Sequence, residues 1–159
     1  MRSKLQLLLD EYSESHQNET NKLIHWICVP LIFWAIVALL YSVPNTGLKD
    51  LIGNTFYANW AVFAMIPVLV YYFSLSVPIS IGMIAFISFC LYISDLLLQS
   101  AAYPFWAIAL VVFALAWVGQ FYGHKVEGKK PSFLKDIQFL LIGPAWLMHF
   151  IYKRLGIKY

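Results

Sequence analysis

Four long apolar runs, separated by short polar or proline-containing links, dominate the hydrophobic pattern of this chain. The first extends from about Leu23 to Val43 and ends at the turn Pro44-Asn45-Thr46-Gly47. From Trp60 to Leu98 the chain is apolar for roughly twice the length of about 20 residues that a bilayer requires. The break at Ser74 to Pro78 is the natural place for a hairpin between two spans. With a last run from Phe105 to about Phe121, the pattern predicts four transmembrane helices.

Two shorter segments flank these runs. Residues Ile137 to Tyr152 form an apolar stretch with Gly143-Pro144 at its middle, and a broken segment of this length is typical of a re-entrant or interfacial segment. At the other end, Lys4 to Tyr12 carries leucines at positions 5, 7, 8 and 9 among charged residues. This pattern predicts a short amphipathic helix that lies on the membrane surface.

The composition agrees with this pattern, because 61% of the 159 residues are hydrophobic and only 12% are charged. We therefore expect an all-α integral membrane protein with a single membrane domain over residues 1–159. It would comprise a cytoplasmic amphipathic segment (1–22), a four-span bundle (23–122), and a cytoplasmic and re-entrant C-terminal segment (123–159). Cys28 and Cys90 both lie in apolar runs, which is typical of small core residues and predicts no disulfide.

Positive charges gather outside the apolar runs. Those before the first run are Arg2, Lys4 and Lys22, those after the fourth are Lys125, Lys129, Lys130, Lys135, Lys153, Arg154 and Lys158, and only Lys49 lies in a connecting loop. By the positive-inside rule both termini are cytoplasmic, which requires an even number of spans. A bacterial inner membrane and an endoplasmic-reticulum membrane fit equally well. Topology and attraction to anionic membrane lipid account for the basic C-terminal region, so we expect no nucleic-acid partner.

The four histidines of the chain all lie at the ends of the apolar region. His16 and His25 precede or open the first run, and His124 and His149 follow the fourth. An even number of spans between the two pairs brings all four imidazoles to the same membrane face. Because imidazole is a common metal ligand, this placement indicates a metal site.

The spacing of polar residues near these histidines predicts how they meet. Gln120, His124 and Glu127 share one face of a helix that continues past the membrane edge. His16 and His25 are nine residues apart and would point to opposite sides of a continuous helix. We therefore expect a bend near Asn18 or Thr20, both good N-cap residues, to bring the two imidazoles together.

The donor set limits the metal. Four histidines with Glu127 nearby suffice for a mononuclear iron or zinc centre, and they are too few for the histidine-rich di-iron centre of membrane desaturases. A structural zinc ion would be closed by four ligands, whereas non-haem Fe(II) keeps positions open for substrate and oxygen. The residues alone do not choose between the two.

Asp95 is the only acidic residue in the middle of the apolar region, and an intramembrane carboxylate is by default a functional candidate. It lies near the end of the third run, close to Gln99 and to the membrane face opposite the histidines. We therefore interpret Asp95 as a helix-end residue in contact with water and expect no role in metal ligation.

The chain resembles a known family, the small membrane proteins related to the 2-hydroxy fatty acid dioxygenase of the yeast endoplasmic reticulum. The resemblance covers nearly the whole chain and rests on the order and spacing of short motifs. These comprise Tyr12, His16, Asn18, Asn21, His25 and Pro30, then Trp117, Gln120, Gly123-His124, Glu127-Gly128 and Pro131, and finally Gly143-Pro144 ahead of His149.

The resemblance implies Fe(II)-dependent α-oxidation, in which a long-chain 2-hydroxy fatty acid reacts with O₂ and is shortened by one carbon. The family's histidines match His16, His25, His124 and His149, which we expect to be the iron ligands. In this interpretation Glu127 orients His124 or accepts a proton, and Lys125, Lys129 or Lys130 attracts the substrate carboxylate. The residues expected to hold the ligands in place are Asn18, Asn21 and Gln120.

Two alternatives stay open. A non-enzymatic lipid-binding or assembly protein would hold a structural zinc ion between its terminal segments, and removal of the metal would unfold them. A transporter fits less well, because the chain has no intramembrane charge cluster and no evident repeat. A homodimer, which the sequence allows, would supply the transporter with further spans.

Overall fold

The computed structural model describes residues 3–100, 102–128 and 133–159, and of residues 133–138 only the backbone. Within these ranges the chain is helical and contains no strand, which confirms the predicted all-α class. The helices are α1 (Lys4–Ser13), α2 (Glu19–Tyr41), α3 (Thr46–Ile52), α4 (Trp60–Leu75), α5 (Val77–Ser100), α6 (Phe105–Glu127) and α7 (Phe133–Leu155).

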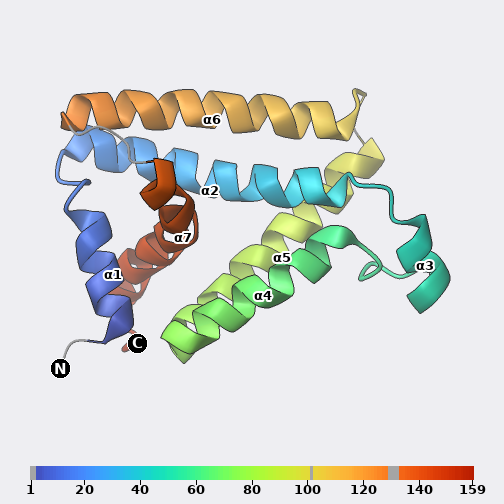
Figure 1. The fold of residues 1–159 in the computed structure, drawn as a ribbon, viewed down its shortest axis with the longest axis horizontal. Coiled ribbons are helices and arrows are strands. Elements are labelled where there is room, and N and C mark those ends of the chain that lie inside the picture. The colour runs from blue at the N-terminus through green and yellow to red at the C-terminus, as the bar shows by residue number, and fades with distance from the viewer. Residues whose placement is uncertain (1–2, 101, 129–132) are drawn as a thin grey trace.

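Helices α2 and α6 lie side by side along the longest dimension of the molecule and run in opposite directions (Figure 1). The hairpin of α4 and α5 crosses them at an angle, and its turn falls at Ser76, within the predicted break. As a result the start of α2 and the end of α6 lie at one end of the molecule, together with α1 and α7. The short helix α3 lies at the opposite end (Figure 1).

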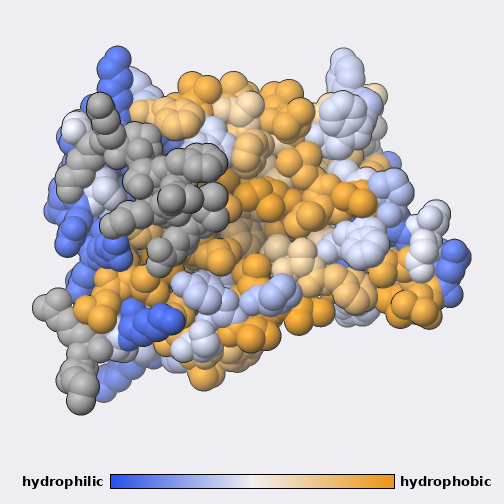
Figure 2. Space-filling model, viewed as in Figure 1, coloured by the Kyte–Doolittle hydropathy of each residue, from blue (hydrophilic) through white to orange (hydrophobic). Residues whose placement is uncertain are grey.

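Apolar residues form a band across the middle of the face shown in Figure 2, and strongly hydrophilic residues gather at its two ends. In the described part of the chain three helices, α2, α5 and α6, are long and apolar enough to cross a membrane. The fourth predicted span, α4, is an apolar helix of only 16 residues, shorter than the usual spanning length of about 20. Three candidate spans are therefore established, and the predicted number of four is not.

The C-terminal segment is continuous where the sequence predicted a break, and its re-entrant or interfacial position stays a prediction. It forms one helix of 23 residues that passes through Gly143-Pro144 without a break, and it is not among the three candidate spans. A proline removes one backbone N–H from a helix, and neighbouring helices can compensate for that loss. Gly143 packs closely here, since an added Cβ would lie 3.0 Å from Val29 and 3.1 Å from the Tyr12 hydroxyl. These contacts with α1 and α2 favour the continuous helix.

Helix α1 confirms the predicted N-terminal amphipathic helix. Its buried residues, Leu5, Leu8, Leu9 and Tyr12, share one face and belong to the main hydrophobic cluster, and Leu7 is exposed. Helix α1 packs against α7. The terminal helices therefore form a small layer beside the start of α2, where the histidines lie.

Asp95 links two helices at the end of the molecule away from the histidines. Its carboxylate accepts hydrogen bonds from the Tyr41 hydroxyl (2.9 Å) and from the Gln99 side chain (2.7 Å). The residue is half-buried near the end of α5. This structural role agrees with the interpretation of Asp95 as a helix-end residue.

Two glycines on α6 let it approach α2 closely. A Cβ at Gly119 would lie 2.6 Å from the sulfur of Cys28, and a Cβ at Gly123 would collide with the side-chain oxygen of Asn21. Small residues at such positions are typical of packed helices in membranes. The close approach brings the first turns of α2 against the last turns of α6.

We expect Gly123→Ala to destabilise the protein by about 1–3 kcal/mol, the usual cost of overpacking. Asn21 is fully buried and would have to move, which would strain its hydrogen bond to Glu127. The matched control is Gly47→Ala in α3, where nothing lies within 4 Å of the added Cβ. Thermal unfolding in detergent measures both variants. Equal midpoints for the two would show that the α2–α6 contact tolerates a methyl group.

Candidate metal centre

Three histidines from three different parts of the chain meet at one end of the molecule. His16 lies in the link between α1 and α2, His25 is in the second turn of α2, and His124 is in the last turn of α6. The link bends where predicted, because the Asn18 side chain caps α2 by accepting from the backbone N–H groups of Thr20 (2.9 Å) and Asn21 (3.3 Å). The antiparallel pairing of α2 and α6 supplies the third ring.

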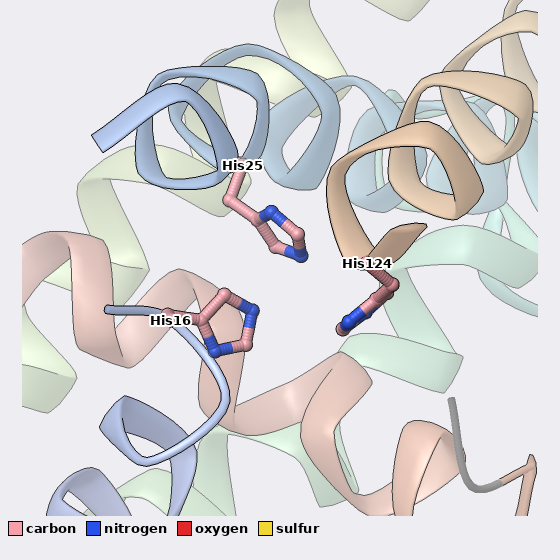
Figure 3. A group of neighbouring side chains, drawn as sticks. All are labelled: His16, His25 and His124. Atoms are coloured by element: carbon pink, nitrogen blue, oxygen red, sulfur yellow. The ribbon is translucent and has the colours of Figure 1, made fainter. Parts of the chain in front are cut away.

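The three imidazoles are close and shielded from solvent. Their ring centroids are 4.2 Å apart for His16 and His25, 5.1 Å for His25 and His124, and 5.6 Å for His16 and His124. One nitrogen of each ring lies within 4.8 Å of the others. His16 and His25 are buried and His124 is half-buried. Figure 3 shows the three rings directed toward a common space.

Backbone carbonyls fix the protonation pattern of two rings. The Nδ1 atom of His16 lies 2.6 Å from the carbonyl oxygen of Tyr12, and that of His25 lies 2.9 Å from the carbonyl oxygen of Asn21. A carbonyl only accepts hydrogen bonds, so in each neutral ring Nδ1 carries the proton and Nε2 carries the lone pair. This arrangement is common for metal-ligating histidines.

The donor set fits a single transition-metal ion. Imidazole nitrogens bind such ions at about 2.1 Å, so two ligands of one ion lie about 3–3.5 Å apart. The three nitrogens lie within 4.8 Å of one another, so rotation of the rings would have to bring them somewhat closer around an ion. Neutral imidazole suits zinc, iron, copper and nickel, and it does not suit magnesium or calcium, which prefer oxygen.

Aromatic side chains enclose the His16 ring. Tyr12 stacks on it with a centroid distance of 4.1 Å and an interplanar angle of 6°. Trp146 of α7 lies 5.5 Å away and donates its indole N–H to the Ser13 hydroxyl (2.8 Å). Trp146 is far from His16 in the chain, and nothing in the sequence placed it here. Tyr12 is four residues before His16, but the spacing alone did not predict that the two rings stack.

Glu127 joins α6 to the link that carries His16. One carboxylate oxygen accepts from the backbone N–H of Gln17 and the other from that of Asn18, both at 2.9 Å. The second oxygen also accepts from the side chain of Asn21 at 2.9 Å. Three N–H donors stabilise the charged form of a carboxylate. Glu127 therefore fixes His16 and His124 relative to each other. It lies three residues after His124 on α6, and it accepts hydrogen bonds from Gln17 and Asn18, which directly follow His16.

The structure describes three other polar residues that the sequence predicted near the site, Asn21, Gln120 and Lys125. Asn21 is fully buried, and its side-chain amide also donates to the carbonyl of Ser15 (3.1 Å). Gln120 is buried on α6, one turn before His124. Lys125 is exposed in the last turn of α6. Lys129, Lys130 and Pro131, which the sequence analysis also named, lie outside the described residues.

His149 is not brought together with the other three histidines among the described residues. It is half-buried on α7, and its Nδ1 forms a hydrogen bond with the hydroxyl of Tyr159. Burial lowers the pKa of His149, the nearby Lys153 lowers it further, and Asp10 opposes both. The ligand role expected for His149 therefore stays a prediction that the arrangement of the three other rings does not require.

The comparison with known protein families covers nearly the whole chain. A family model described as "2-hydroxy-palmitic acid dioxygenase Mpo1-like" matches residues 3–155, which include all four histidines and Glu127. Neither a curated protein nor a solved structure matches the chain. The family match confirms the resemblance that the sequence motifs indicated.

Proposed function

Because the chain belongs to the 2-hydroxy-palmitic acid dioxygenase Mpo1-like family, we propose that it is an Fe(II)-dependent membrane enzyme that shortens long-chain 2-hydroxy fatty acids by one carbon. The observation that carries the proposal is the group of three imidazoles, from the α1–α2 link, α2 and α6, beside an apolar helical bundle. This arrangement supports a site in which the protein binds a metal ion and the hydrophobic substrate enters from the membrane.

The reaction needs no further reductant. A 2-hydroxy acid and O₂ give the acid with one carbon fewer, CO₂ and water. The bond between the carboxyl carbon and the hydroxyl-bearing carbon breaks, and the substrate supplies all four electrons that reduce O₂. No 2-oxoglutarate is therefore required.

In this proposal His16, His25 and His124 hold the iron ion through ring nitrogens that lie within 4.8 Å of one another. Iron bound by three neutral imidazoles supplies the one-electron chemistry that O₂ needs in order to react with an organic substrate. The carbonyls of Tyr12 and Asn21 keep the Nδ1 proton on His16 and His25 and so orient both rings. Glu127 fixes the link that carries His16 against α6.

The surroundings favour a long acyl chain with a polar head. Tyr12 and Trp146 cover the His16 ring and exclude water from that side of the centre. The apolar band across the middle of the molecule (Figure 2) can accommodate hydrocarbon, while the carboxylate and hydroxyl of the substrate reach a polar end. We further propose that this end, with both termini, faces the cytoplasm.

A structural zinc ion is less well supported. Zinc in structural sites is closed by four protein ligands, and only three histidines come together among the described residues. An ion held by these three rings would have positions left for other molecules, as an oxygenase requires.

We expect the protein, loaded with Fe(II) in neutral-lipid nanodiscs, to consume O₂ when given 2-hydroxypalmitate. Each O₂ consumed should yield one pentadecanoic acid and one CO₂. An oxygen electrode measures the uptake, and mass spectrometry measures the products. Palmitate, which lacks the 2-hydroxyl group, is the matched control and should give no uptake. Iron-loaded protein that consumes no O₂ with 2-hydroxy acids of several chain lengths would contradict the proposal.

A further inference from the structure

A groove lies between the first turns of α2 and the C-terminal turns of α7, apart from the three histidines. It has a volume of about 530 Å³ and is lined by Trp26, Phe150, Ile151, Lys153, Arg154 and Leu155. This volume falls within the range of small-molecule sites, roughly 300–1,000 Å³. The groove thus combines an apolar wall with two adjacent cations.

A row of aromatic rings connects the groove with the metal centre. Trp26 lies 6.3 Å from Phe150, and Phe150 meets Trp146 edge to face at 4.7 Å. Trp146 in turn lies 5.5 Å from the His16 ring. The groove and the histidines therefore share one wall of packed side chains, with the fully buried Trp146 between them.

The two cations have a simpler explanation, which does not account for the whole feature. Lys153 and Arg154 occupy the last turn of α7, where positive charge offsets the helix dipole, and they also attract anionic lipid. Neither effect requires a hollow or an aromatic wall beside the charges. An exposed tryptophan, 39% accessible, over a concave apolar surface next to Lys153 and Arg154 is instead suited to an anionic head on a hydrocarbon chain.

We propose that this groove binds the carboxylate end of a long-chain fatty acid, with the carboxylate at Lys153 and Arg154 and the first part of the chain on Trp26 and Phe150. The inference rests on the proposed function in one respect, since it makes the groove a docking site for substrate on its way to the histidines. A single apolar wall beside two adjacent cations suits the one chain and one carboxylate of a fatty acid better than a two-chain phospholipid.

The test uses a 16-carbon fatty acid with a photoreactive diazirine in its chain and no 2-hydroxyl group. Metal-free, full-length protein in neutral-lipid nanodiscs is irradiated with this probe, and the labelled peptides are identified by mass spectrometry. We expect label at Trp26 and in the segment 150–155. Palmitate should compete for it, whereas methyl palmitate, which has the same chain without the charge, should not.

The double variant Lys153→Gln/Arg154→Gln should weaken competition by palmitate about three- to tenfold, as expected for the loss of partly exposed ion pairs. Both residues are exposed, so their replacement should not unfold the protein. Lys4→Gln, which removes an exposed cation from α1, is the matched control and should leave competition unchanged.

Two results would overturn the proposal. One is competition by palmitate that does not change in the double variant. The other is competition by phosphatidylglycerol as strong as that by palmitate, which would make the groove a lipid contact. Because the probe cannot be turned over and the protein carries no metal, the result is independent of catalysis. Binding without any O₂ consumption by the iron-loaded protein would support the groove while contradicting the proposed function.

Discussion

Replacing His25 by alanine is expected to weaken iron binding by at least about 100-fold. His25 is buried and offers one of only three nitrogens that converge in the described structure. Even residues that merely orient a ligand typically contribute 10- to 100-fold to metal affinity, so the loss of a ligand should exceed that range. Iron content by mass spectrometry and competition with a chelator under anaerobic conditions measure the effect.

His25→Gln guards against simple unfolding, because glutamine fills a similar volume and keeps an N–H near the Asn21 carbonyl but has no imidazole nitrogen. It should lose iron as His25→Ala does while retaining the thermal stability of the metal-free protein. His149→Ala is the comparison that decides between three and four ligands. We expect it to change iron affinity less than about threefold, since the ring lies against Tyr159 and outside the group of three. Loss of iron from His149→Ala would support the four-histidine set that the family resemblance implies.

Replacing Glu127 by alanine is expected to have the second largest effect. Two backbone N–H groups and the Asn21 side chain would lose a charged acceptor, which we expect to lower the stability of the α1–α2 link by about 1–3 kcal/mol after allowance for partial exposure. Because that link carries His16, iron affinity should fall by about 10- to 100-fold. Hydrogen exchange should show faster exchange at the amides of Gln17 and Asn18 in particular.

A matched control and a second variant separate the two roles that the sequence suggested for Glu127. Glu19→Ala removes a carboxylate whose side chain is 89% exposed and should leave iron affinity and exchange at residues 17 and 18 unchanged. Glu127→Gln keeps the size and one acceptor oxygen, so its effects should lie between those of the wild type and Glu127→Ala. If Glu127→Gln abolished turnover with iron affinity and amide exchange unchanged, Glu127 would be a proton acceptor rather than a positioning residue.

The sequence predicted the elements around the site well, because membrane helices are governed by local hydrophobicity. The apolar runs correspond to α2, α4, α5 and α6, and the break near Ser74 to Pro78 became the turn between α4 and α5. The bend before α2 followed from the capping preference of Asn18. The shared face of Gln120, His124 and Glu127 followed from helical periodicity on α6. Each of these features depends on residues close together in the chain.

Other features depended on contacts between distant residues. The length of α7 could not be predicted, since a Gly-Pro pair normally ends a helix and only its packing against Val29 and Tyr12 favours continuity. For the same reason the sequence showed no sign of the groove beside Lys153 and Arg154, because that groove forms only where α7 lies near the first turns of α2.

By itself, then, the sequence determined the helical membrane class, the approximate bounds of the apolar helices, the family, and the gathering of histidines at one end of the bundle. Hydrophobic periodicity, charge bias and helix capping are local or summed properties, and a single chain displays them directly. The tertiary structure alone decided which histidines converge, that Glu127 accepts hydrogen bonds from the link that carries His16, and that Trp146 lies between the His16 ring and a basic groove. These depend on the close approach of α6 to α2 at Gly119 and Gly123 and on the docking of α7, which are set by side-chain shapes far apart in the chain.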